Sequence, residues 1–320
     1  MIESIATSPT PERDEPKVRL RAGTAAELVA MVPYLFGFPP HESVVVLGFK
    51  TKRVEGAARL DLPAVFDDEY LGELRARLGD VAAPGNRLIV IGWMDDVTAA
   101  EQAVERVVAA LGQVDQTIFV SRGRCRQGTG PWVEYPHSVP AAERAGLMLQ
   151  ADRDAVAALV RGPQPADAWD GLWALVCESV EHKTPAERQK RAKELLTKGL
   201  DIPHTLSVWE RLELAALVRD GAVRDQLWAR LTRQTAARFV ALWQLIVAVT
   251  PDAGAPPVLG LLGMAAWVDG NGALQSCCLN RGLALDPEHS LLKLVHTINM
   301  MAIHPKAWTD LVRSHLVHAA

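Results

Sequence analysis

The sequence has few cysteines and no long apolar run, and each absence excludes a class of protein. Four cysteines in 320 residues are too few for a disulfide scaffold and fit a reducing compartment. The longest apolar stretches, residues 239–249 and 256–268, fall short of the roughly 20 residues that a membrane span needs. Glu3 stands where a signal peptide carries Lys or Arg. We therefore expect a cytoplasmic protein without membrane contact.

Several fingerprints of chemistry are also missing. The chain has no Gly-x-x-x-x-Gly-Lys-Ser/Thr loop, no Gly-x-Gly-x-x-Gly after a strand and no Gly-x-Ser-x-Gly turn. His41 and Ser43 flank Glu42, but neighbouring side chains on an extended backbone point to opposite faces, so they do not form a nucleophile and base. We assign no catalytic residue and no cofactor, and whether the protein is an enzyme stays open.

The composition is that of a globular chain with more than one core. Hydrophobic residues make up 49% and charged residues 22%, which excludes a disordered or fibrous protein. A length of 320 residues favours two domains. We expect a disordered leader over residues 1–16, because it is rich in proline and charge, then an α/β domain over 17–150 and an all-helical domain over 151–320.

The first domain alternates apolar strands with amphipathic helices. Thr24 and Glu27 have the spacing of a helix capping box, and Pro33 predicts that the helix after them is short or kinked. Further strands are expected at 18–21, 43–49, 54–62, 87–93 and 116–120, and further helices at 67–78 and 97–111. This alternation predicts a mostly parallel or mixed sheet with flanking helices.

The second domain reads as helical hairpins joined by short links. Thr184 and Glu187 form another capping-box pattern, and helical periodicity continues to about residue 317. Residues 259–287 match a tetratricopeptide unit in part, although an ordinary helix pair explains them as well. Seven of the nine tryptophans lie in this half, and any of them exposed would mark a partner site.

Several segments together resemble a known family. They are the run Val32-Pro33-Tyr34-Leu35 with Gly37-Phe38, the segments 42–46 and 58–63, and the C-terminal stretches 265–269, 272–274 and 284–291. The chain is similar here to the domain of unknown function 4192 family, met in actinobacteria and actinophages. The family usually carries a Cys-Cys-Pro cluster after the last strand, whereas residues 122–138 keep only Cys125. The resemblance implies an architecture and no activity.

Charged residues follow the predicted strands and give the best candidate ligand site. Carboxyl ends of parallel strands meet at one edge of a sheet, where carboxylates beside guanidinium groups could hold Mg²⁺ and a phosphate. An aspartate before residue 97 could equally cap the helix there, and residues 122–130 could be an ordinary loop. The candidates are Asp61, Asp95, Asp96, Arg122, Arg124 and Arg126.

Metal and nucleic-acid sites find less support. The cysteines lack Cys-x-x-Cys spacing, and the pair His315 and His318 lies at the chain end, so we assign no metal site. Arg188, Lys190 and Arg191 lie on one basic helix that could face phosphates. The net charge of -4 makes nucleic acid an unlikely partner.

Three functions remain open. The first is a non-enzymatic interaction or scaffold protein that binds a protein partner, or itself, through its helical half. The alternative is a ligand- or nucleotide-binding protein, or a Mg-dependent enzyme, with its site at the strand ends. Nucleic-acid association through the basic helix is the weakest of the three.

Overall fold

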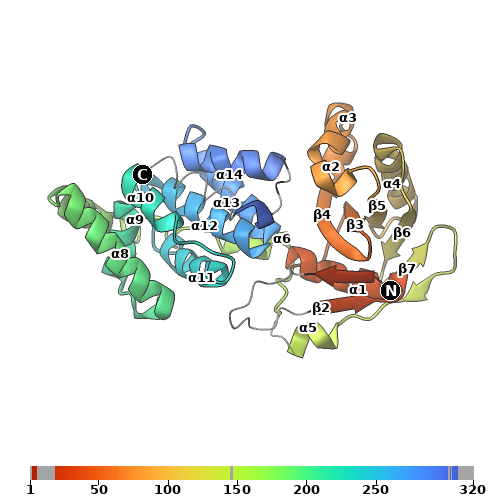
Figure 1. Ribbon diagram of the computed structural model, residues 1–320, viewed down its shortest axis with the longest axis horizontal. Helices are drawn as coiled ribbons and strands as arrows, with labels where there is room; N and C mark the ends of the chain where they lie inside the picture. Colours follow the sequence, from red (N-terminus) through yellow and green to blue (C-terminus); the bar gives the residue numbers. More distant parts are fainter. Residues whose placement is uncertain (1, 6–18, 145–146, 302, 304, 309–320) are drawn as a thin grey trace. The chain divides into compact units, whose positions relative to one another are not determined.

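The computed structural model describes residues 2–5, 19–144, 147–301, 303 and 305–308. The chain folds into two compact units, the first comprising Met1–Asp152 and Met300–Ile303 and the second Arg153–Asn299 and His304–Ala320. In Figure 1 the first unit runs from red to yellow-green and the second from green to blue. We call them the α/β unit and the helical unit.

The α/β unit is built on one sheet of eight strands in the order β2-β1-β4-β3-β5-β6-β7-β8. The strands are β1 Ile2–Ile5, β2 Arg19–Ala22, β3 Ser43–Lys50, β4 Arg53–Asp61, β5 Arg87–Trp93, β6 Gln116–Ser121, β7 Arg124–Gln127 and β8 Val133–Glu134. Only β1–β4 and β5–β6 pair in parallel. The sheet is therefore mixed, and the expectation that it is mostly parallel is wrong because β3 and β7 each form hairpins.

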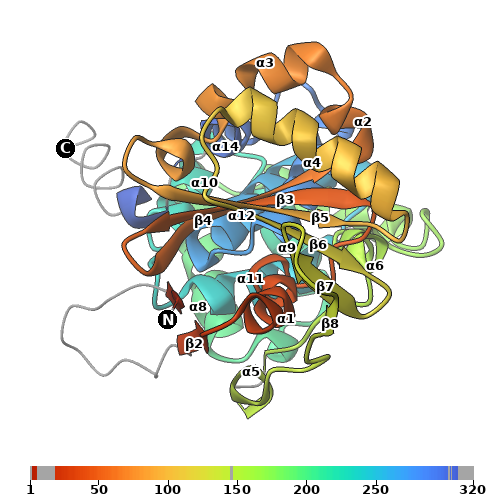
Figure 2. The same cartoon turned by 90° about the vertical axis from the view of Figure 1, so that its right-hand side faces the viewer.

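Helices cover both faces of this sheet. Figure 2 shows α2, α3 and α4 on one face and α1 on the other. The central strand β3 alternates between them, with Val44 and Val46 in the first core and Val45 and Leu47 in the second, so its run of β-branched residues is buried on both sides. The helices of this unit are α1 Ala25–Phe36, α2 Leu62–Val65, α3 Asp68–Arg77, η1 Gly79–Ala82, α4 Val97–Leu111 and α5 Pro140–Arg144.

The first helix begins and ends on recognisable signals. The Thr24 hydroxyl and the Glu27 carboxylate form the expected capping box, and Gly37 ends the helix with a left-handed φ of 79°. Pro33 lies inside α1, which continues to Phe36. Part of the predicted leader is structured, because Ile2–Ile5 form a strand that pairs with β2 and β4. The rest of the predicted leader, residues 1 and 6–16, lies outside the described residues.

The helical unit contains no strand among its described residues. Its helices are α6 Arg153–Ala158, α7 Asp170–Glu181, α8 Pro185–Asp201, η2 Pro203–Thr205, α9 Val208–Leu217, α10 Gly221–Trp228, α11 Ala236–Val247, η3 Asp252–Gly254, α12 Ala255–Asp269, α13 Gly272–Leu285, α14 Ser290–Met300 and η4 Pro305–Ala307. Residues 255–268 of α12 are buried all round, and α11 and α13 pack against this helix. The tetratricopeptide-like character of residues 259–287 stays a prediction, and the helix expected up to residue 317 runs beyond the described residues.

Candidate functional site

Three strands of the α/β unit end at the same edge of the sheet. Ser43 at the start of β3 lies opposite both Asp61 of β4 and Trp93 of β5, and Trp93 lies opposite Val120 of β6. The predicted site residues after these strands therefore share one sheet edge. Adjacent strands are about 4.8 Å apart, so β4 and β5, with β3 between them, are about 10 Å apart. Asp61 thus starts at a distance from the residues that follow β5.

Asp61 interacts within its own strand. Its carboxylate binds the Arg59 guanidinium at 2.6 Å, because residues two apart on a strand share a face. Arg59 also donates to the His41 carbonyl at 3.2 Å and lies over the Phe38 ring at 5.6 Å from its centroid. This arrangement ties the start of β3 to the end of β4.

The loop after β5 is held by neighbours on two sides. The Ser121 hydroxyl donates to the Asp95 carbonyl at 3.2 Å, and the Asp95 amide donates to the Glu42 carboxylate at 3.5 Å. Glu42 has a φ of 42°, a left-handed conformation that a non-glycine residue adopts only where its surroundings fix it. The Asp95 side chain itself is exposed on the surface. Glu42, Asp95 and Ser121 are therefore the part of the edge that the structure does bring together.

Asp96 caps the next helix. Its carboxylate accepts from the amides of Thr98 at 2.9 Å and Ala99 at 3.2 Å at the start of α4. The capping alternative considered from the sequence is thus confirmed for Asp96. A carboxylate that already satisfies two backbone donors has less capacity left for a metal or ligand.

The arginine-rich segment after β6 is a hairpin rather than one long loop. Arg122 and Gly123 have φ values of 47° and 77°, and Ser121 pairs with Arg124 across them, which is the geometry of a two-residue type I′ turn. Arg122 is exposed at the tip, and Arg124 donates to the Trp132 carbonyl at 3.0 Å. The turn therefore presents Arg122 at the same sheet edge as Asp95.

Arg126 lies away from this edge. It forms an ion pair with Glu101 of α4, and its guanidinium lies 4.8 Å from the Phe119 ring centroid and 5.2 Å from that of Trp132. It therefore joins β7 to α4 and holds the segment 128–132 against the sheet. Of the six candidate ligand residues, Asp61, Asp96 and Arg126 each have a local structural partner.

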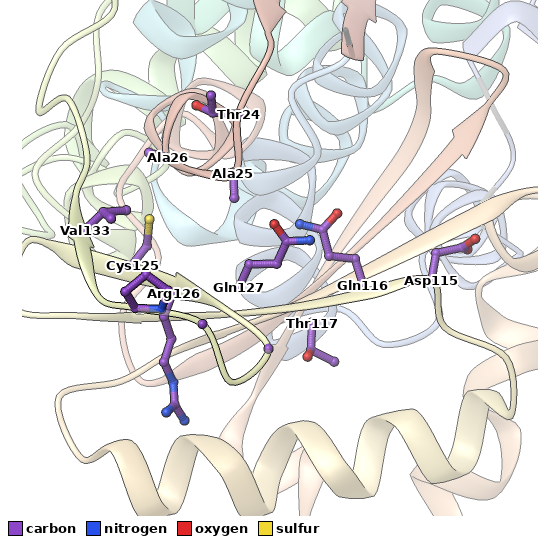
Figure 3. Close-up of a pocket in the computed structure, with 13 residues that line it drawn as sticks. Thr24, Ala25, Ala26, Asp115, Gln116, Thr117, Cys125, Arg126, Gln127 and Val133 are labelled. Carbon is purple, nitrogen blue, oxygen red and sulfur yellow. The ribbon is translucent and has the colours of Figure 1, made fainter.

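The cavity in the α/β unit lies at another place, beneath the first turn of α1. It measures about 580 Å³, and of the six candidates only Arg126 lines it. Figure 3 shows the Gln116 and Gln127 side chains pointing toward Ala25, while the Arg126 side chain points to the opposite face of the sheet. Sequence analysis missed Gln116 and Gln127, because two glutamines on separate strands carry no motif. A polar surface with two carboxamides suits a hydrogen-bonding ligand.

The thiols do not form a reactive or metal-binding group in the part of the chain that the structure describes. All four cysteines are free, and no three His, Cys, Asp or Glu side chains converge there as metal ligands. Burial raises the pKa of Cys125, and burial followed by the neighbouring Cys125 raises the pKa of Tyr135. A raised pKa keeps the Cys125 thiol protonated and less nucleophilic.

The basic helix of the predicted nucleic-acid site is α8. Arg191 binds the buried Glu213 of α9 at 2.9 Å, and Arg188 donates to the carbonyls of Val180 at 3.1 Å and Glu181 at 3.0 Å. These two guanidinium groups thus hold α8 against its neighbours, whereas Lys190 is exposed. Sequence pattern does not reveal the partners, because Glu213 lies 22 residues away.

Apolar side chains reach the surface where α8 meets α9. Ile202, at the end of α8, is 59% exposed, and Trp209, in the first turn of α9, is 38% exposed. Of the other tryptophans in this half, Trp173, Trp243, Trp267 and Trp308 are buried. We call Ile202 and Trp209 the α8–α9 apolar pair. The sequence offered the excess of tryptophan as a signal, but not which one is exposed.

Comparison with known proteins gives one family. No helix among the described residues combines the length and apolarity that crossing a bilayer requires. No curated protein and no solved structure matches the chain. The family described as Domain of unknown function (DUF4192) matches residues 26–306, which include the strand-end edge, the cavity beneath α1 and the α8–α9 apolar pair. The chain therefore belongs to the DUF4192 family.

Proposed function

We propose that this protein binds another protein through its helical unit, and that the α8–α9 apolar pair is the centre of the contact. The observation that carries the proposal is Trp209, a large aromatic side chain left 38% exposed. Tryptophan is enriched among the residues that contribute most to protein–protein affinity. It buries a large apolar area and can donate a hydrogen bond from its indole nitrogen.

The backbone around Trp209 is held in place before any partner arrives. The Ser207 hydroxyl and the Glu210 carboxylate form a capping box at the start of α9. Lys198 of α8 binds Glu210 at 2.8 Å, and this contact lowers the pKa of Glu210. An aromatic side chain on a fixed helix end loses little conformational entropy on binding, which favours affinity.

The charge on the outer face of α8 indicates the chemistry of the partner. Lys190 and Lys193 are exposed, and their spacing places them on the same face as Thr197. The buried face carries Ala192, Leu195 and Leu196. We therefore infer a partner segment with an apolar side chain for the α8–α9 apolar pair and acidic side chains for the two lysines.

Capture with matched variants tests this proposal. The tagged full chain, its Trp209→Ala variant and a Leu175→Ala control are each incubated with lysate of cells that carry the gene, and bound proteins are quantified by mass spectrometry. Leu175 is 56% exposed on α7, so it controls for loss of an exposed apolar side chain. We expect a near-stoichiometric protein with wild type and control that is lost with Trp209→Ala. Equal capture by all three chains would overturn the proposal.

A ligand site at the strand ends is the second candidate. It is supported by the left-handed backbone at Glu42 and by the carboxylates of Glu42 and Asp95 near the Arg122 turn. A ligand that binds there raises the melting temperature by mass action. We expect a nucleotide or divalent ion to give a shift that Asp95→Asn abolishes. A screen in which nothing moves the melting temperature would exclude this site.

Nucleic-acid association is the weakest candidate. Arg188 and Arg191 would have to exchange their contacts with neighbouring helices for phosphates, and of the three predicted residues only Lys190 is fully available. Binding through this helix would weaken with added salt and with Lys190→Glu.

A further inference from the structure

The outer edge of β4 carries backbone groups that no described strand pairs with. β3 pairs with β4 along its whole length, from Arg53 to Asp61. On the other side, β1 pairs only with Arg53 and Val54. Residues 56–60 therefore form an open sheet edge as far as the described residues go, and we call them the β4 edge.

The register shows which backbone groups point outward. The Met94 amide donates to β6, and the Leu88 carbonyl accepts from Asp115 next to β6, so the even-numbered residues of β5 face β6. Backbone direction alternates along a strand, so Val45 of β3 faces β5 and Val46 faces β4. Ala58, opposite Val46, faces β3. The N–H and C=O groups of Ala57 and Arg59 therefore point out of the sheet.

The β4 edge lacks the features by which proteins protect an open strand. It contains neither proline nor lysine, and Gly56, Ala57 and Ala58 are small and partly exposed. Small side chains allow the close approach of another backbone. The β-bulge beside Glu55 interrupts the ladder only at the start of the edge. An open edge of this kind is a surface for adding one more strand.

The sequence of β4 indicates which strand would be added. Around Ala57 its charges are antisymmetric, with Glu55 two residues before and Arg59 two residues after. An antiparallel copy of β4 centred on Ala57 thus places Glu55 of each chain opposite Arg59 of the other. A register centred on Ala58 would instead oppose Glu55 and Asp61, which carry the same charge. Opposite-charge pairs across strands stabilise a sheet, and like-charge pairs destabilise it.

We propose that two copies of this chain associate through antiparallel pairing of their β4 edges, in the register centred on Ala57. The two sheets then continue into each other, and the two copies are related by a two-fold axis through this pair of strands. Arg59 already binds Asp61, so Glu55 of the second copy extends that ion pair into a three-membered network. A short edge buries less surface than a permanent dimer, so association depends on concentration.

Sedimentation velocity of the full chain, from about 1 to about 500 µM, tests the proposal. We expect the wild type to pass from monomer to dimer within this range. Ala57→Pro removes an outward-pointing N–H and no bond to β3, so it should fold and stay monomeric. Glu55→Lys places a cation opposite Arg59 of the copy and should also stay monomeric. Circular dichroism and the melting temperature of each variant confirm that it folds.

Glu105→Lys is the matched control, because Glu105 is an exposed glutamate on α4, away from the β4 edge. It reverses the same charge and should dimerise as the wild type does. A wild type that stays monomeric over the whole range would overturn the proposal. So would a dimer that persists in both Ala57→Pro and Glu55→Lys.

Discussion

At the scale of single residues, the contacts of charged side chains decide what each can do. Asp95 and Asp96 are adjacent in the sequence, but the Asp96 carboxylate caps α4 and the Asp95 carboxylate is exposed. Arg122 and Arg126 are four residues apart, and one is at an exposed turn while the other lies between two aromatic rings and Glu101. Residue type therefore gave the set of candidates, and local hydrogen bonding separates them.

His289 makes the stability of the helical unit depend on pH. Its Nδ1 accepts from the Leu292 amide at 3.5 Å, and its carbonyl accepts from Lys293, so His289 is the N-cap of α14. Burial lowers the pKa of His289, and Arg224 of α10 lowers it further, against a smaller rise from Asp286. The unfolded chain therefore takes up this proton more readily than the folded one, and stability falls as pH drops below about 6.5.

His289→Asn should remove this pH dependence. Asparagine keeps an oxygen acceptor for the N-cap at every pH. Urea unfolding at pH 7.5 and pH 5.5 should show a wild-type loss larger than that of the variant by a few tenths to about 1 kcal/mol, the range of an N-cap. An equal change in both proteins would show that the imidazole is not the cap.

Glu213 is the buried anion that joins three helices. Its side chain is 5% exposed and binds Arg191 of α8 at 2.9 Å and Lys183, just after α7, at 3.6 Å. The hydrogen bond with Glu213 is the main cause of the raised pKa of Arg191, ahead of the opposing effect of burial. Glu213→Gln leaves two cations with one neutral acceptor and should cost about 3 kcal/mol of unfolding free energy.

Denaturant unfolding checks this value against Glu194→Gln as the control. Glu194 contacts the same Arg191 at 3.7 Å, but its side chain is 51% exposed. An exposed ion pair contributes at most about 1 kcal/mol. Similar losses for the two variants would contradict the role given to burial.

At the scale of elements, continuous patterns were predictable and short polar strands were not. The bounds of β5 and α4 match the sequence prediction, because β5 is an uninterrupted apolar run and α4 has an aspartate cap and one apolar face. β7 reads Arg-Cys-Arg-Gln, and only Cys125 is buried, so its sequence looks like a loop. Its strand conformation depends on pairing with β6 and on the Arg126 contacts, which sequence periodicity does not contain.

The glycines of β5 and α3 should respond oppositely to alanine. A Cβ at Gly92 would lie 2.8 Å from Val104 Cγ2 and 3.3 Å from the Ala100 carbonyl, so β5 and α4 pack closely there. Gly92→Ala should destabilise the protein by about 1–3 kcal/mol. Gly72, exposed inside α3, has no neighbour within 4 Å, and Gly72→Ala should stabilise it by up to about 1 kcal/mol. Thermal unfolding of the two variants should shift in opposite directions, and a shared direction would refute the packing argument.

At the scale of the whole molecule, the chain separates binding surfaces between two compact units. The α/β unit has the strand-end edge, the cavity beneath α1 and the β4 edge, while the helical unit has the α8–α9 apolar pair. The two-part organisation follows from a change in periodicity that the sequence shows. The positions of the binding surfaces do not, because they depend on which side chains neighbouring elements leave exposed.

The most direct test of the account is the affinity of a purified, captured partner for the wild type and for Trp209→Ala. Isothermal titration with the full chain should show a loss of at least about 30-fold for the variant, equivalent to about 2 kcal/mol. Leu175→Ala should bind as the wild type does. An unchanged affinity for Trp209→Ala would contradict the central claim that the helical unit binds its partner through the α8–α9 apolar pair.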